Sequence, residues 1–166
     1  MIVVVMGVTG SGKSSIGRPL ASALRVPFIE GDDFHDPADV EKMRRGVSLT
    51  AEDRAPWLDR LNGELRRHGS AGAVLACSAL TEQSRERLVA GVADVRFVFL
   101  HGDEAVLRSR LDARRDHFAP SSLVTSQLDT LEEPDDAVKV DVTSPHDAIV
   151  ADVLNALSSG EHPALG

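Results

Sequence analysis

The chain has 166 residues, of which 42% are hydrophobic and 27% are charged, proportions typical of one soluble globular domain. Its formal net charge is −8 and it contains no long basic run, which argues against non-specific binding to nucleic acid. The single cysteine excludes an internal disulfide framework, and the apolar runs are too short to span a bilayer. No basic region precedes Ile2, so we expect a cytoplasmic protein.

A phosphate-binding loop is predicted near the start of the sequence. An apolar run at residues 2–6 leads into Gly-Val-Thr-Gly-Ser-Gly-Lys-Ser at residues 7–14, and a helical pattern follows. Glycines let backbone N–H groups approach phosphate oxygens, and the helix directs its positive end at the same anion. A Gly/Ser-rich surface turn is the alternative, but the order of strand, loop and helix disfavours it.

This loop predicts a site for ATP and Mg²⁺. We expect Lys13 to reach the β- and γ-phosphates and the Ser14 hydroxyl to bind the metal ion. The full set of residues predicted to bind the nucleotide is Gly7, Thr9, Gly10, Ser11, Gly12, Lys13, Ser14 and Ser15, joined by Arg110 further along the chain.

Five short apolar runs alternate with helical patterns along the chain, at residues 2–6, 26–29, 73–76, 95–100 and 137–142. This alternation predicts an α/β fold in which a parallel sheet is covered by helices on both faces. Ligands of such sheets bind at the carboxyl ends of the strands. Each segment that follows a strand is therefore a candidate part of the site.

Acidic residues and a histidine follow the second predicted strand, within residues 30–36. A carboxylate near the γ-phosphate can orient a substrate hydroxyl and accept its proton, and we assign this role to Asp32. Glu30 is the candidate for holding Mg²⁺ through water, because the third strand ends in Cys77-Ser78 and supplies no aspartate there. His35 is expected to bind substrate hydroxyls. A solvated acidic turn is the alternative interpretation.

Further candidates lie on the next two elements. Arg54 follows a predicted helix N-cap at residues 48–53; it is either a solvated charge or a planar partner for a substrate carboxylate. Ser78 can donate to a substrate hydroxyl. Cys77 is expected to be a small buried hydrophobic residue, and Trp57 to belong to the core. Arg85 and Arg87 are expected on a solvated helix face.

A lid is predicted at about residues 110–125. Arg110 and Arg114 lie where a helical pattern is broken by His117 and the residues after it. Arginines on a closing lid would stabilise the charge that develops on the transferred phosphoryl group, and Arg114 would also contact the substrate. A salt-bridged helix end is the alternative. An amphipathic helix at 121–131 follows, then a helix from about Pro145 and a disordered tail at about 159–166.

Several of these segments together resemble the small bacterial-type gluconokinases. The matching stretches, in the family's order, are the phosphate loop, Gly31-Asp32 with His35, Lys42-Met43, Asp53-Arg54 with Pro56-Trp57-Leu58, Cys77-Ser78-Ala79-Leu80, Arg110 with Arg114, His117-Phe118, Ser126-Gln127, and Leu131-Glu132 with Pro134. They span nearly the whole chain. Departures from the family pattern are mild: Asp36 follows the histidine where proline is usual, and Leu128 replaces a usual phenylalanine.

The resemblance implies a P-loop NTPase fold like that of adenylate kinase: a three-layer sandwich with a five-stranded parallel sheet and a lid. It implies transfer of the ATP γ-phosphate to the 6-hydroxyl of D-gluconate, usually by a homodimer, with Asp32, His35, Arg54 and Ser78 around the substrate. Shikimate kinase is the second enzyme considered, but its usual Gly-rich turn after the third strand is missing here. A GTPase switch is disfavoured because no Asn-Lys-x-Asp motif is present.

Overall fold

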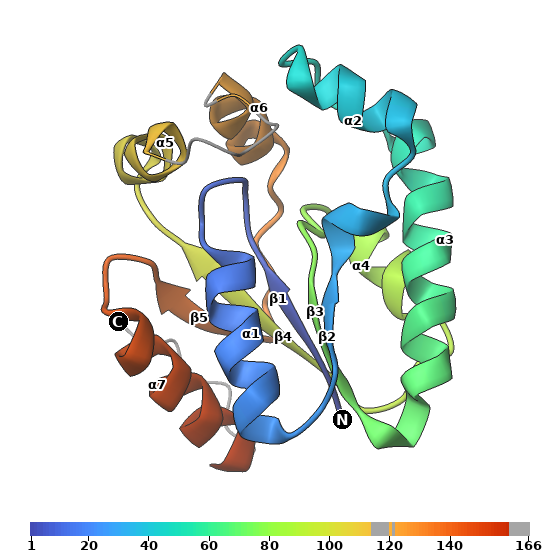
Figure 1. The fold of residues 1–166 in the computed structure, drawn as a ribbon, viewed down its shortest axis with the longest axis vertical. Coiled ribbons are helices and arrows are strands. Elements are labelled where there is room, and N and C mark those ends of the chain that lie inside the picture. The colour runs from blue at the N-terminus through green and yellow to red at the C-terminus, as the bar shows by residue number, and fades with distance from the viewer. Residues whose placement is uncertain (114–119, 121, 160–166) are drawn as a thin grey trace.

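The computed structural model describes residues 1–113, 120 and 122–159. Five parallel strands form one sheet between two layers of helices (Figure 1). The strands are β1 (Ile2–Met6), β2 (Phe28–Glu30), β3 (Ala73–Ala76), β4 (Val95–His101) and β5 (Ala137–Asp141), in the spatial order β2-β3-β1-β4-β5. The predicted α/β sandwich with a five-stranded parallel sheet is therefore confirmed.

Each face of the sheet is covered by a pair of helices. Helices α1 (Lys13–Leu24) and α7 (His146–Ser159) pack on one face, and α3 (Ala51–His68) and α4 (Glu82–Val89) pack on the other (Figure 1). Two apolar clusters result, because successive residues of a strand point to opposite faces: Val3 and Val5 of β1 belong to one cluster, Ile2 and Val4 to the other. All five residues of β1 are buried, as expected for the central strand of a parallel sheet.

Three helices lie beyond the carboxyl ends of the strands, where the sequence places its candidate residues. They are α2 (Pro37–Arg44), α5 (Glu104–Asp112) and α6 (Ser122–Thr130), which Figure 1 shows above the sheet. A short 3₁₀ turn, η1 (Gly31–Phe34), joins β2 to α2, and a second, η2 (Gly69–Ala71), precedes β3. Met43, Leu49 and Leu123 form a small apolar cluster between α2, the start of α3 and α6.

Helix ends largely follow the local sequence signals. Thr50 caps α3 through a reciprocal pair of hydrogen bonds with Asp53, and the Thr81 hydroxyl accepts from Ser84 N–H at the start of α4. The prediction for Arg85 is wrong, however. Its guanidinium is partly buried and donates to the backbone carbonyls of Ala79, Leu80 and Glu132, so it ties the start of α4 to the segment before β5.

The predicted second strand is displaced along the chain. It was expected at residues 26–29 but spans Phe28–Glu30, because Arg25 adopts a left-handed conformation and Val26 N–H donates to the Ala21 carbonyl at the end of α1. Of the predicted lid, the ends fall in α5 and α6, whereas Arg114, His117 and Phe118 lie outside the described residues. Ser159 ends α7, and the rest of the predicted tail also lies outside them. Within the described ranges, no helix is both long and apolar enough to cross a membrane.

Candidate active site

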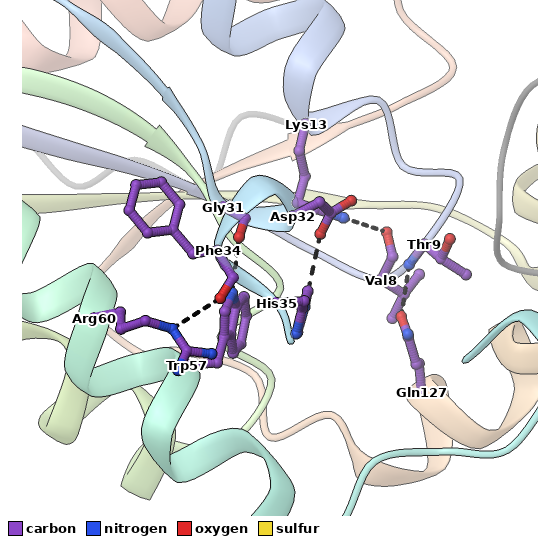
Figure 2. Close-up of polar contacts among 10 residues, drawn as sticks. All are labelled: Val8, Thr9, Lys13, Gly31, Asp32, Phe34, His35, Trp57, Arg60 and Gln127. Carbon is purple, nitrogen blue, oxygen red and sulfur yellow. Dashed lines mark hydrogen bonds and ion pairs between the residues drawn. The ribbon is translucent and has the colours of Figure 1, made fainter. Parts of the chain in front are cut away.

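The phosphate loop joins β1 to α1 in a conformation that only glycine allows at two positions. Gly10 has φ 82°, and a Cβ on it would lie 2.7 Å from the carbonyl oxygen of Leu107 in α5. Gly12 has φ 92° and stands at the N-cap of α1. Lys13 begins that helix, and its Nζ donates to the Val8 carbonyl at 3.2 Å (Figure 2). The lysine ammonium therefore lies over the loop, where phosphates bind in proteins with this motif.

Glu30 and Ser14 meet beside the loop. Arg18 lies 3.2 Å from the Glu30 carboxylate, and the Ser14 hydroxyl is close enough to that carboxylate to affect its pKa. Burial raises the pKa of Glu30, and the nearby Ser14 hydroxyl opposes that rise. A hydroxyl and a carboxylate that are close together suit Mg²⁺, which binds few protein oxygens and completes its shell with water and phosphate. Among the described residues, no group of three or more His, Cys, Asp or Glu side chains is arranged to hold a metal ion.

Asp32 is held at the carboxyl end of the sheet by the tight packing of η1. A Cβ on Gly31 would lie 2.3 Å from the Ala76 carbonyl oxygen, so β2 and β3 approach closely only because this residue is glycine. Trp57 Nε1–H donates to the Gly31 carbonyl at 2.7 Å and fixes the turn from the other side (Figure 2). The Asp32 side chain remains 44% exposed and is available to a ligand.

His35 lies against Trp57 with its ring stacked at 4.2 Å between centroids and an interplanar angle of 13°. Its side chain is only 5% exposed, and its Nε2 is 4.0 Å from Asp32 Oδ1. Burial lowers the pKa of His35, an effect that the charge of Asp32 opposes. The buried Nδ1 has no hydrogen-bond partner among the described residues. An unpaired buried nitrogen costs free energy that a ligand hydroxyl could recover.

A partly enclosed hollow lies beside these residues; we call it the acceptor hollow. Its lining residues are His35, Met43, Ser48, Leu49, Arg54, Trp57, Ser78, Leu80, Leu123 and Gln127. Arg54 is half-buried, and burial lowers the pKa of its guanidinium. It forms no salt bridge within the described ranges, so this planar cation is open to a carboxylate from a ligand.

The surroundings of Cys77 show that the phosphate loop and the turn after β2 lie close together. Burial raises the pKa of this thiol to about 12, which confirms the expectation of a small buried hydrophobic residue. Both Lys13 and Asp32 are close enough to perturb that pKa, the lysine lowering it and the aspartate raising it. The ammonium of the phosphate loop and the carboxylate after β2 thus converge on the same end of the sheet.

Of the two arginines predicted on the lid, the structure describes Arg110. Arg110 belongs to α5, the helix whose Leu107 carbonyl abuts Gly10, so this helix packs on the phosphate loop. The Arg110 guanidinium donates to the backbone carbonyl of Val142, just after β5. In this conformation the Arg110 guanidinium is bound to the segment after β5 and, among the described residues, donates no hydrogen bond to the phosphate loop. Arg114, its predicted companion, lies outside the described residues.

Gln127 carried no predicted role in the site. This residue of α6 lines the acceptor hollow, and its Oε1 accepts a hydrogen bond from Thr9 N–H of the phosphate loop at 2.7 Å (Figure 2). The only sequence signal was the Ser126-Gln127 pair among the matching stretches. The apolar walls Met43, Leu49 and Leu123 were likewise unassigned; they come from α2, the loop before α3, and α6.

A parallel α/β sandwich with a phosphate loop, a neighbouring carboxylate and an acceptor hollow defines the class of P-loop small-molecule kinases. Residues 2–134 match a family model described as an AAA domain. The crystal structure of shikimate kinase from Aquifex aeolicus aligns with this chain at a TM-score of 0.63, and the alignment covers 96% of this chain and 98% of the shikimate kinase chain. Their sequence identity is 19%, so this likeness shows a shared fold and no more.

Closer relatives define the family. The thermoresistant gluconokinase of Escherichia coli strain K12 is 36% identical over 166 residues, covering 96% of this chain and 95% of its own. The gluconokinase of Gluconobacter oxydans strain 621H is 47% identical over 136 residues, covering 81% and 76%. A gluconokinase crystal structure from Sinorhizobium meliloti 1021 has 44% identity and a TM-score of 0.86 over 95% of this chain and 91% of its own. The chain belongs to the gluconokinase family.

Proposed function

We propose that this protein transfers the γ-phosphoryl group of ATP to the 6-hydroxyl of D-gluconate, giving 6-phospho-D-gluconate. The observation that carries the proposal is the half-buried Arg54, which forms no salt bridge with any described residue, in a hollow that also contains His35 and Ser78 and adjoins Asp32 and the phosphate loop. Such a hollow suits a small polyhydroxy acid: a guanidinium for the carboxylate and polar groups for the hydroxyls. Family membership supports the same substrate.

The proposed reaction is an in-line displacement at the γ-phosphorus. The acceptor hydroxyl oxygen forms the new P–O bond as the bond to the β–γ bridging oxygen breaks and ADP departs. Asp32 orients that hydroxyl and accepts its proton. Lys13 and the backbone N–H groups of the loop stabilise charge on the phosphates, because they are already directed at the position that the anion takes. Positioning of the two substrates supplies most of the remaining acceleration.

Mg²⁺ is proposed to be held by Ser14 and, through water, by Glu30, whose pKa the nearby Ser14 hydroxyl lowers. When bound, the ion would neutralise charge on the β- and γ-phosphates. Arg110 and Arg114 are proposed to stabilise the transferred phosphoryl group from the lid, at about residues 110–125 of a single kinase domain. We further propose that the protein is cytoplasmic and that it forms a homodimer. Sedimentation of the purified protein tests the oligomeric state directly.

The test is a coupled assay of ADP release with ATP and Mg²⁺ against D-gluconate, its epimers, shikimate and no acceptor. We expect turnover with gluconate that falls by a factor of about 10²–10⁴ in Asp32→Asn, because the amide cannot accept the proton. Asp33→Asn is the matched control, since Asp33 is the adjacent, exposed carboxylate. Turnover with another acid but not with gluconate would assign that acid as the substrate instead. No acceptor-dependent turnover at all would overturn the kinase assignment.

A further inference from the structure

Gln127 connects two parts of the site that lie far apart in the chain. Its Oε1 accepts from Thr9 N–H at 2.7 Å across a separation of 118 residues (Figure 2). The partner is a backbone donor, so the atom that faces it must be the carbonyl oxygen of the carboxamide, and the NH₂ group is directed elsewhere. This contact gives the phosphate loop a side-chain partner from α6.

Other contacts besides the one with Thr9 hold α6 in place. Thr125 donates to Glu104 of α5 at 2.5 Å, and the Ser126 hydroxyl lies 2.7 Å from that of Ser48. Leu123 is buried with Met43 and Leu49. Hydrogen bonds and apolar contacts from three neighbouring residues therefore anchor the helix independently of Gln127.

The same side chain forms part of the wall of the acceptor hollow, together with His35, Arg54 and Ser78. Its NH₂ group donates no hydrogen bond to any of the described residues, although Gln127 is half-buried. A carboxamide whose oxygen is engaged on the phosphate loop thus retains two N–H donors beside the hollow. A hydroxyl or carboxylate oxygen of a bound acid is a suitable acceptor for them.

We infer that Gln127 is a positioning residue that aligns the acceptor with the phosphate loop: its oxygen holds Thr9 N–H while its NH₂ group donates to an oxygen of the bound sugar acid. This inference rests on the proposed function, which names that acid as D-gluconate. Because one rigid amide contacts both sides, the distance between the acceptor hydroxyl and the γ-phosphate depends on it. Misplacement of reacting atoms by about 1 Å can cost about 10²-fold in rate.

The test compares Gln127→Ala and Gln127→Glu with the unaltered enzyme. Alanine removes both contacts, and we expect kcat/KM for gluconate to fall by about 10- to 100-fold, while the Kd of a non-hydrolysable ATP analogue changes by less than about threefold. Glutamate keeps an acceptor for Thr9 N–H but replaces the donors with a negative charge that repels the anionic sugar acid, so it should lose at least as much kcat/KM. In both variants, the rate of ADP release without gluconate should rise relative to the rate with gluconate. Gln83→Ala, at an exposed glutamine of α4, should match the unaltered enzyme.

Two measurements keep this inference separate from the proposed function and from a structural role. Calorimetric binding of gluconate, with the ATP analogue present, is measured on the unaltered protein; its absence would overturn the proposed function and this inference with it. Gluconate binding and kcat/KM that are retained in Gln127→Ala would overturn the inference alone. So would a lowered melting temperature accompanied by unchanged kcat/KM per folded enzyme, since that result assigns the residue to stability.

Discussion

The phosphate-binding half of the site comes from one continuous segment, residues 7–15, whereas the acceptor half combines side chains from η1, α3, α6 and the turn after β3. The first half consists largely of backbone N–H groups held by glycines with positive φ. The second half consists of side chains: a guanidinium, an imidazole, a hydroxyl and a carboxamide. A phosphate is bound by the same geometry in many proteins, but an acceptor must be recognised by its own pattern of oxygens.

This difference has a consequence for substitutions. In the phosphate-binding half, the Lys13 ammonium contacts the nucleotide, so its loss should slow transfer from ATP to any acceptor. In the acceptor half each side chain should affect the sugar acid and leave the nucleotide almost unchanged. Among the residues that the structure describes, Gln127 belongs to both halves, because it contacts the loop while lining the hollow.

The largest effect is expected from Lys13→Met. Methionine preserves the length of the side chain but removes the ammonium over the loop, and we expect kcat to fall by about 10³-fold with gluconate. Calorimetric binding of gluconate should change little, because the acceptor hollow is intact. Lys139→Met is the matched control: this lysine of β5 pairs with Glu133 at 3.4 Å, away from the loop. Gluconate binding lost together with kcat would contradict the division into two halves.

An intermediate effect is expected from Arg54→Ala. Loss of the guanidinium should raise KM for gluconate by about 10- to 100-fold with little change in KM for ATP, because a charge-assisted pair to the substrate carboxylate is removed. Arg54→Lys should recover part of the loss, since a point charge cannot form the bidentate pair. Arg66→Ala, at an exposed position of the same helix, serves as the control. An equal rise in KM for ATP would place Arg54 in the nucleotide site instead.

The smallest effect concerns stability, and it arises from His35. Burial lowers its pKa in the folded state below the ordinary value of 6.5, so the unfolded chain binds this proton first as pH falls. The stability contributed by the neutral imidazole is therefore present above pH 6.5 and is lost as pH falls through the lowered pKa. His35→Gln should reduce the difference in urea-unfolding free energy between about pH 7.5 and about pH 5.5.

Trp57 offers the readout, because it is the single tryptophan and stacks on His35. Since His35→Gln alters that stack, far-ultraviolet circular dichroism should be recorded alongside fluorescence. His146→Gln, at an exposed position at the start of α7, is the control and should retain the full pH dependence. An unchanged pH dependence in His35→Gln would show that the imidazole is not kept neutral by burial.

Local sequence signals predicted those features that local interactions decide. The bounds of β1 and β3 agree residue for residue, and the N-cap predicted within residues 48–53 is formed by Thr50 at the start of α3. The second strand was displaced because its first expected residue, Val26, completes a hydrogen bond to α1, and Pro27 has no N–H to give to the sheet. The prediction for Arg85 failed in part because one of the carbonyls that its guanidinium reaches, that of Glu132, lies 47 residues away along the chain.

The sequence by itself determined the phosphate loop, since glycine positions and the adjoining strand and helix specify a backbone conformation within a few residues. It also identified Asp32, His35, Arg54 and Ser78 as candidates by their places after strands and on helices. The tertiary structure places His35, Arg54 and Ser78 around one hollow, with Asp32 Oδ1 4.0 Å from His35 Nε2. It alone decided that Trp57 supports His35 and that Gln127 reaches Thr9. Side-chain contacts between distant segments depend on how helices and strands pack, and no local pattern encodes that packing.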